Sequence, residues 1–141
     1  MDKTKHNTDL YIVRGIPGAG KSTFAKKLIE KGLADVYYEA DMFFEKNGKY
    51  EFDPSKLGLA HEWCRKQVET ALDAGKTVVV SNTFTRLSEI FPYTDLCDDL
   101  GKTFKVVRLE TNYGSIHNVP KDAIEKMKNR FQDYKDEVIV R

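Results

Sequence analysis

The sequence lacks any long apolar run, and this absence excludes several classes of protein. No stretch approaches the roughly 20 apolar residues that span a bilayer, so we expect no membrane partner. The polar start of the chain, residues 1–9, has no apolar segment of the kind found in signal peptides. We therefore expect a cytoplasmic protein with a disordered N-terminus over residues 1–8 and one domain over residues 9–141.

Cysteine and net charge are also scarce. The only two cysteines, Cys64 and Cys97, have neither metal-site nor redox-site spacing, so we expect reduced thiols at apolar helix positions. The 23 basic and 22 acidic residues nearly cancel. This balance gives no electrostatic reason to expect a protein that coats nucleic acid, although it remains compatible with a nucleic acid held in one local basic cleft.

The chain does contain a regular alternation of strand and helix patterns. Short apolar runs predict buried strands, the last of them a possible fifth strand, at 10–13, 36–39, 77–80, 104–109 and 138–140. Apolar residues at helical spacing predict helices at about 20–32, 54–75, 86–100 and 120–134. This order predicts an α/β fold with three layers, in which helices cover both faces of a parallel sheet of four to five strands. Ligands of such folds bind at the carboxyl ends of the strands.

A complete phosphate-binding pattern follows the first predicted strand. Residues 15–22 read Gly-Ile-Pro-Gly-Ala-Gly-Lys-Ser, which matches Gly-x-x-x-x-Gly-Lys-Ser. Glycines let backbone amides converge on phosphate oxygens, and the following helix directs its free amides at the same charge. Lys21 supplies a cation for the outer phosphates, and Ser22 supplies a hydroxyl ligand for Mg²⁺. We expect ATP and Mg²⁺ to bind here, with a nucleotide site made of Gly15, Pro17, Gly18, Ala19, Gly20, Lys21, Ser22 and Thr23.

Polar residues also follow the second and third predicted strands. Asp41 can accept the proton of an attacking hydroxyl, or it can cap a helix that starts there, and the local sequence does not choose between these roles. Ser81, Asn82 and Thr83 stand where many nucleotide hydrolases place a magnesium-binding carboxylate. Their lack of charge argues against rapid hydrolysis that drives mechanical work, and ordinary turn chemistry is the alternative interpretation.

The polar segment 110–119 is a candidate lid, since kinases need a segment that closes over the phosphates. A cation from such a lid usually stabilises the transferring phosphoryl group. The segment contains no arginine, so the candidates are His117, Lys121 and Arg130. Alternatively, His117 is an ordinary surface residue and Arg130 forms a salt bridge on its own helix.

Taken together, residues 15–23, Asp41, residues 81–83 and residues 117–120 resemble the P-loop kinases related to polynucleotide 5′-hydroxyl kinase. Small members of this group are often labelled AAA family ATPases, and the resemblance runs from about residue 10 to residue 134. It implies transfer of the terminal phosphoryl group of ATP to a hydroxyl. It also implies catalytic roles for Lys21, for Asp41 as the general base, and for Asn82, where polynucleotide kinases carry an aspartate.

The chain departs from the phage-type enzyme at two places. That enzyme has an arginine three residues beyond its base, where this chain has Phe44, and it also has a lid arginine. The leading hypothesis is transfer to the 5′-hydroxyl of a polynucleotide. The alternatives are a small-molecule kinase that acts on a nucleoside or nucleotide sugar, and a nucleotide-dependent binding switch with little catalysis. Aromatic residues near Asp41 could stack on a base, although core packing is the preferred interpretation for Phe43 and Phe44.

Overall fold

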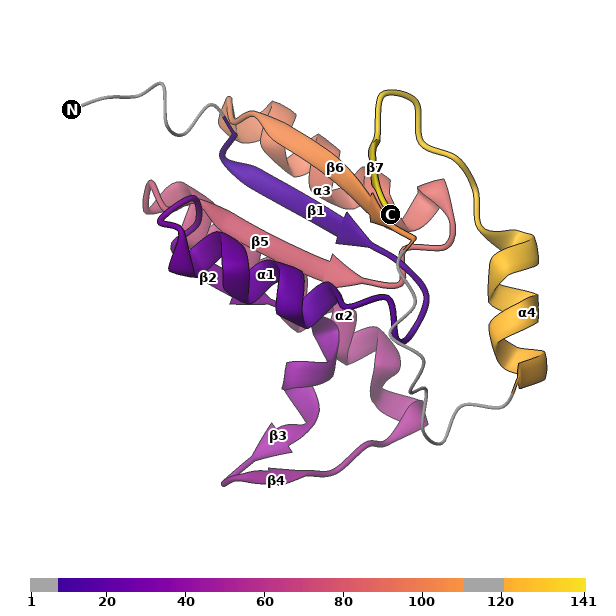
Figure 1. Cartoon of the computed structure of the whole chain (residues 1–141). Helices are drawn as coiled ribbons and strands as arrows, with labels where there is room; N and C mark the ends of the chain where they lie inside the picture. Colours follow the sequence, from indigo (N-terminus) through magenta and orange to yellow (C-terminus); the bar gives the residue numbers. More distant parts are fainter. Residues whose placement is uncertain (1–7, 111–120) are drawn as a thin grey trace.

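The computed structural model describes residues 8–110 and 121–141. Its main sheet has five strands in the order β2-β5-β1-β6-β7, and every neighbouring pair is parallel (Figure 1). The strands are β1 (Leu10–Arg14), β2 (Val36–Tyr38), β5 (Val78–Asn82), β6 (Phe104–Leu109) and β7 (Val138–Val140). The predicted parallel α/β sheet is confirmed, including its fifth strand.

Helices cover both faces of this sheet, as the three-layer prediction requires (Figure 1). One face packs on α1 (Lys21–Glu30), and the other packs on α2 (Leu57–Asp73) and α3 (Leu87–Leu100). The strand period of two divides the side chains between the layers. Along β1, for example, Ile12 belongs to the core beneath α2 and α3, whereas Val13 belongs to the core beneath α1.

The segment between β2 and α2 begins with a helical turn, as expected near Asp41, and continues into a hairpin that was not predicted. A short 3₁₀ helix, η2 (Ala40–Phe44), leads into an antiparallel hairpin of β3 (Glu45–Lys46) and β4 (Lys49–Tyr50). Asn47 and Gly48 form the turn with positive φ values of 53° and 78°, the backbone that an Asn-Gly pair favours. A second 3₁₀ helix, η3 (Pro54–Lys56), then opens α2.

A buried arginine fixes the carboxyl end of β1. The Arg14 side chain is fully buried, and its Nε and Nη2 atoms donate to the Phe84 carbonyl at 3.0 and 2.6 Å. Its Nη1 atom pairs with Glu137 Oε1 at 2.9 Å, and the guanidinium lies 4.2 Å from the Phe131 ring centre. These contacts draw the chain out of the helix predicted over 120–134, so the last helix, α4 (Lys121–Arg130), ends four residues earlier.

Two expectations drawn from composition can be compared with the structure. Cys64 and Cys97 are buried free thiols on α2 and α3, as predicted, and burial raises the pKa of Cys97 to about 11. Within residues 8–110 and 121–141, no helix is both long and apolar enough to cross a membrane. The predicted disordered start, residues 1–8, falls almost entirely outside the described residues.

Candidate active site

The phosphate-binding pattern forms the connection between β1 and α1. Gly18 and Gly20 have φ values of 87° and 85°, which L side chains rarely adopt. A Cβ on Gly15 would lie only 3.1 Å from both Ala19 Cβ and the Leu109 carbonyl oxygen. Gly20 is the N-cap of α1, makes no side-chain capping bond there, and no acidic residue occupies the first turn. The amides at this helix end are therefore open to an anion, as predicted.

Lys21 is folded back over this loop. Its Nζ atom donates to the carbonyl oxygens of Gly15 and Ile16 at 2.8 and 3.0 Å. Burial lowers the pKa of Lys21 to about 8, while the charge of the Glu39 carboxylate acts in the opposite direction. The ammonium group is thus held at the loop by neutral carbonyls, and an arriving phosphate would offer it a stronger partner.

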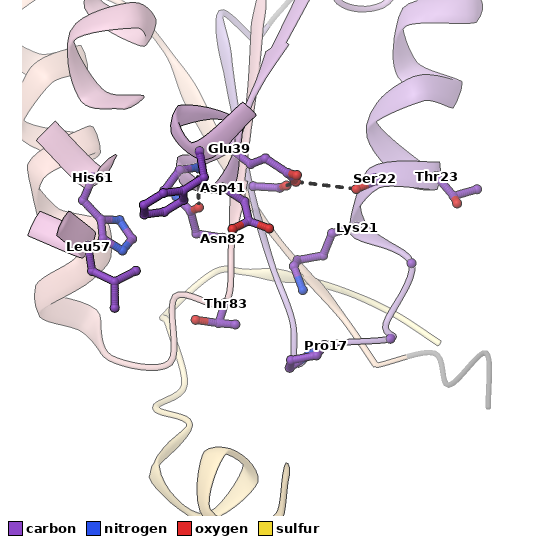
Figure 2. Close-up of a pocket in the computed structure, with 15 residues that line it drawn as sticks. Pro17, Lys21, Ser22, Thr23, Glu39, Asp41, Leu57, His61, Asn82 and Thr83 are labelled. Carbon is purple, nitrogen blue, oxygen red and sulfur yellow. Dashed lines mark hydrogen bonds between the residues drawn. The ribbon is translucent and has the colours of Figure 1, made fainter. Parts of the chain in front are cut away.

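A cleft of about 420 Å³ separates the phosphate loop from a wall built on η2, β5 and α2 (Figure 2). Lys21 and Ser22 line one side, and Asp41 lines the other. From the loop, Pro17, Gly18, Gly20 and Thr23 also line the cleft, whereas Ala19 is buried behind it. β2 does not pair with β1, because β5 lies between them, yet the end of β2 still brings Asp41 to the cleft.

Asp41 presents an exposed carboxylate at this wall. Glu39 is the N-cap residue of η2, so Asp41 lies inside the first turn and the capping alternative does not hold. The Asp41 side chain is exposed, and its Oδ1 atom accepts a hydrogen bond from the Tyr50 hydroxyl at 2.7 Å. Partial desolvation, together with the Asp41 carboxylate, raises the pKa of Tyr50 to about 12. Tyr50 therefore remains a hydrogen-bond donor to Asp41 at neutral pH.

Asn82 connects the end of β5 to the turn that carries Asp41. Its Oδ1 atom accepts a hydrogen bond from the Ala40 amide at 3.0 Å. Its Nδ2 atom is buried and has no partner among the described residues other than the weakly bonding thiol of Cys64. Asn82 and Thr83 both line the cleft, and Ser81 is fully buried beside them. The contact with Ala40 makes Asn82 a residue that positions the Asp41 turn.

Sequence reasoning missed Glu39, which also lines the cleft. The Oε2 atom of Glu39 lies 3.5 Å from Ser22 Oγ and 3.4 Å from Ser81 Oγ. The Tyr37 hydroxyl donates to the same carboxylate, and burial together with this bond raises the pKa of Tyr37 to about 12. A signal was available, because strand alternation puts Tyr37 and Glu39 on the same side at the carboxyl end of the strand that leads to Asp41.

The Ser22 and Glu39 oxygens suit the coordination chemistry of Mg²⁺. Mg²⁺ prefers hard oxygen ligands and is commonly held by one or two protein groups together with substrate phosphates and water. The described part of the chain contains no cluster of three or more His, Cys, Asp or Glu side chains that could hold a metal without such help. The residues present therefore fit a metal ion that binds together with a nucleotide.

Neither of the two lid candidates that the structure describes lines the cleft. His117 lies outside the residues that the structure describes. Lys121 and Arg130 are exposed on α4, which lies beyond the carboxyl ends of the strands in Figure 1, and neither lines the cleft. The lid role of all three residues stays a prediction.

The sequence belongs to a recognised domain family. A family model described as an AAA domain matches residues 10–134. Human NEDD4-binding protein 2 is 31% identical over 137 residues, an alignment that covers 89% of this chain but only 8% of that protein. The chain thus corresponds to a small part of this curated relative.

Solved structures with the same fold include kinases. One chain of a Pnkp1/Rnl/Hen1 RNA repair complex superimposes with a TM-score of 0.68 at 18% identity, over 89% of this chain and 44% of that one. The APS kinase CysC of Mycobacterium tuberculosis, in complex with AMPPNP and APS, gives a TM-score of 0.64 at 18% identity, over 96% and 88%. At these identities the likeness establishes the fold alone. With its P-loop kinase fold and the match over residues 10–134, this chain belongs to the AAA domain family.

Proposed function

We propose that the chain transfers the terminal phosphoryl group of ATP to the 5′-hydroxyl of a polynucleotide. One observation carries this proposal: Lys21 and Ser22 line the same cleft as Asp41, on the opposite side of it. Phosphoryl transfer needs little covalent chemistry from the protein, and its main requirements are charge stabilisation and alignment of the attacking oxygen. A phosphate loop and an exposed carboxylate on opposite sides of one cleft meet both requirements.

The loop residues act on the phosphates. Amides at the start of α1 and the Lys21 ammonium bind the phosphate oxygens, and Lys21 leaves the carbonyls of Gly15 and Ile16 to do so. Their positive charge stabilises the charge that develops on the β–γ bridging oxygen as its bond to the γ-phosphorus breaks. Because Lys21 is partly buried, its charge is screened less than that of a fully exposed lysine.

Asp41 acts on the acceptor. Its carboxylate accepts the proton of the attacking hydroxyl while that oxygen forms its bond to the γ-phosphorus, and ADP leaves. The side chain is exposed, so the proton can then pass to solvent. Asn82 holds the Ala40 amide and the Tyr50 hydroxyl holds Asp41 Oδ1, so the base has a defined position.

Ser22 and Glu39 would hold the magnesium ion. A bound Mg²⁺ neutralises phosphate charge and orients the phosphate chain for in-line attack. Glu39 supplies the negative ligand that the uncharged residues Ser81 and Asn82 do not. Tyr37 donates to Glu39 and so holds its carboxylate beside Ser22.

The proposal is tested by incubating the protein with γ-labelled ATP and an oligonucleotide that ends in a 5′-hydroxyl. A matched oligonucleotide that already has a 5′-phosphate is the acceptor control, and only the hydroxyl-ended strand should become labelled. Asp41→Asn should abolish transfer and leave ATP affinity within about twofold. Glu45→Gln removes a nearby exposed carboxylate that does not line the cleft and should have no effect. Transfer retained in Asp41→Asn would defeat the assignment of the base.

A small-molecule kinase is the second candidate, and one observation favours it. Phe44 is only 3% exposed and packs in the core, so the position three residues beyond Asp41 offers no cation to a nucleic acid. Nucleosides and nucleotide sugars supplied as acceptors would separate the two candidates, because each predicts label in a different product. ATP binding without label in any acceptor would favour a nucleotide-dependent switch over both.

A further inference from the structure

A second cleft, of about 320 Å³, opens from the far side of the phosphate cleft. The two clefts share His61, Asn82 and Thr83, so they meet at the carboxyl end of β5. The second cleft then continues between α2 and α3, away from the phosphate loop, where Tyr93 and Arg65 line it. A molecule seated here would reach the wall of the phosphate cleft that carries Asp41.

Two buried polar atoms along this cleft have only a weak partner. Tyr93 is 4% exposed, and neither its hydroxyl nor Asn82 Nδ2 has a nitrogen or oxygen partner among the described residues. In that part of the chain, both hydrogen-bond only with the thiol of Cys64, a weak hydrogen-bonding group. Buried polar groups almost always have partners, and leaving one without a partner is costly. A hydroxylated ligand in this cleft would offer both atoms a stronger partner than the thiol.

The rim of the cleft carries one cation. Arg65 lies one helical turn beyond His61 on the same face of α2, is exposed, and forms no ion pair with any described carboxylate. Its charge acts on Tyr93, where it partly opposes the rise in pKa that burial causes. Arg65 is therefore available to bind an anionic group that enters beside Tyr93.

The remaining lining residues complete a site for a sugar. Glu89 on α3 presents a carboxylate that can accept a hydrogen bond from a sugar hydroxyl. Phe84 packs edge-on against Tyr93, with ring centres 5.6 Å apart, and provides an apolar wall. Phe84 has a positive φ of 48°, and its carbonyl is held by the Arg14 guanidinium, so this wall is fixed from behind.

We infer that this second cleft binds the terminal nucleotide of the acceptor, with the sugar at Tyr93 and Asn82 and the 3′-phosphate at Arg65. The inference rests on the proposed phosphoryl transfer and extends it, because it assigns a class of acceptor: a sugar that bears both a free hydroxyl and a phosphate. In a ribonucleotide the one remaining hydroxyl, at the 2′ position, donates to Glu89 and accepts from Tyr93 and Asn82, and the free 5′-hydroxyl points through the junction at Asn82 toward Asp41.

The test measures binding separately from catalysis. The protein is first saturated with a non-hydrolysable ATP analogue and Mg²⁺, so that the phosphate loop is occupied, and is then titrated calorimetrically with adenosine 3′-monophosphate or adenosine. The monophosphate should bind about tenfold more tightly than the nucleoside. Arg65→Ala should remove this difference. Lys66→Ala removes the neighbouring exposed cation, which pairs with Glu62, and should preserve it. Equal behaviour of the two variants would overturn the inference.

Tyr93→Phe keeps the buried ring and removes only its hydroxyl. It should weaken binding of the monophosphate and of adenosine alike, by a factor of roughly three to ten. Unchanged affinity for both ligands would remove Tyr93 from the site and contradict the inference.

Steady-state kinetics separate this inference from the proposed function. Arg65→Ala should raise KM for a hydroxyl-ended oligonucleotide with little change in kcat. If the wild-type protein phosphorylates that oligonucleotide and Arg65→Ala has an unchanged KM, the cleft assignment fails and the kinase proposal stands. If the wild-type protein phosphorylates no nucleotide, the kinase proposal fails, and a phosphate preference that depends on Arg65 still supports a nucleotide site in the cleft.

Discussion

The two walls of the active-site cleft present different chemical groups, backbone amides on one side and side chains on the other. The phosphate wall, residues 15–23, consists mainly of backbone amides at the start of α1, with Lys21 folded over them. The opposite wall consists of side chains, including Asp41, Asn82 and His61, that come from three separate elements. A backbone site recognises any polyphosphate, whereas a wall of side chains can differ among relatives that share one fold.

The walls also differ in how they are held. The phosphate loop is shaped mainly by local geometry, since Gly18 and Gly20 within it adopt positive φ values. The opposite wall depends on contacts across the chain, such as Asn82 with Ala40. Residues further along the chain also support this wall. The Arg14 side chain donates to the Phe84 carbonyl, and the backbone N–H of Gln132 donates to the Thr85 carbonyl at 2.7 Å. Remote substitutions should therefore disturb the acceptor side before the nucleotide side.

The largest expected effect separates the two walls directly. Asp41→Asn keeps the size of the side chain and removes its basicity, so phosphoryl transfer should fall by about 10²- to 10⁴-fold. ATP affinity, which depends on the other wall, should stay within about twofold. Single-turnover transfer and ATP calorimetry on the same preparation give both numbers. A comparable loss of ATP affinity would mean that the walls are not separable.

Arg14→Met should reveal the remote support. It leaves the Glu137 carboxylate, whose side chain is 5% exposed, without its main partner, so the free energy of unfolding should fall by about 3 kcal/mol. Chemical denaturation measures the change. Arg141→Met removes an arginine whose side chain is 74% exposed and that pairs with Glu110, and it should have almost no effect. Equal stabilities of the two variants would contradict the structural role assigned to Arg14.

Glu39→Gln tests the carboxylate that lies between the two walls, next to Ser22. The amide keeps the contact with Ser22 but loses the negative charge, so the Mg²⁺ concentration needed for half-maximal transfer should rise about tenfold. Glu45→Gln serves as the matched control on the neighbouring hairpin. An unchanged Mg²⁺ requirement would mean that the ion is held without Glu39.

The pH dependence of ATP binding should report on Lys21 alone. Its pKa is lowered to about 8 in the free protein, and bound phosphates would raise it, so binding takes up a proton above that pH. Affinity should then fall by up to about tenfold per pH unit above pH 8. Titrations at alkaline pH in two buffers of different ionisation enthalpy measure the proton uptake. Absence of uptake would show that Lys21 is already fully protonated in the free protein.

The smallest expected effect concerns the hydroxyl that orients the base. Tyr50→Phe removes the hydrogen bond to Asp41 Oδ1 from an exposed position, so kcat should fall by roughly two- to tenfold. KM for ATP should not change. Phe52→Leu alters the aromatic ring stacked on Tyr50 without touching Asp41, and it provides the control. A fall in kcat of the same size in both variants would point to the hairpin rather than to the hydrogen bond.

The difference between the walls also explains what the sequence could predict. The phosphate loop is local, because its glycines, Lys21 and Ser22 are consecutive, and the strand and helix patterns around it are strong. The five-stranded α/β fold followed from the same patterns. The hairpin beyond Asp41 was also readable from Asn47-Gly48, but no hairpin was predicted there.

Contacts between side chains that are distant in the sequence could not be predicted. Arg14 ends an apolar strand and looks like an exposed charge, and its partner Glu137 is 123 residues away in sequence. Phe131, whose ring contacts the Arg14 guanidinium, lies just beyond the end of α4 and not inside it as predicted. No local sequence signal indicated this earlier end of the helix. Glu39 was missed because its role depends on Ser22 and Ser81, which belong to two other elements. Strand alternation could have placed Glu39 at the carboxyl end of the sheet, but its partners become visible only when the strands are placed side by side.

The most direct test of the account is calorimetric titration of the wild-type protein and Lys21→Ala with ATP in the presence of Mg²⁺. The account predicts saturable binding to the wild-type protein with one site per chain, and loss of most of that affinity in the variant. No binding of ATP to a folded wild-type protein, or equal binding to both proteins, would contradict it.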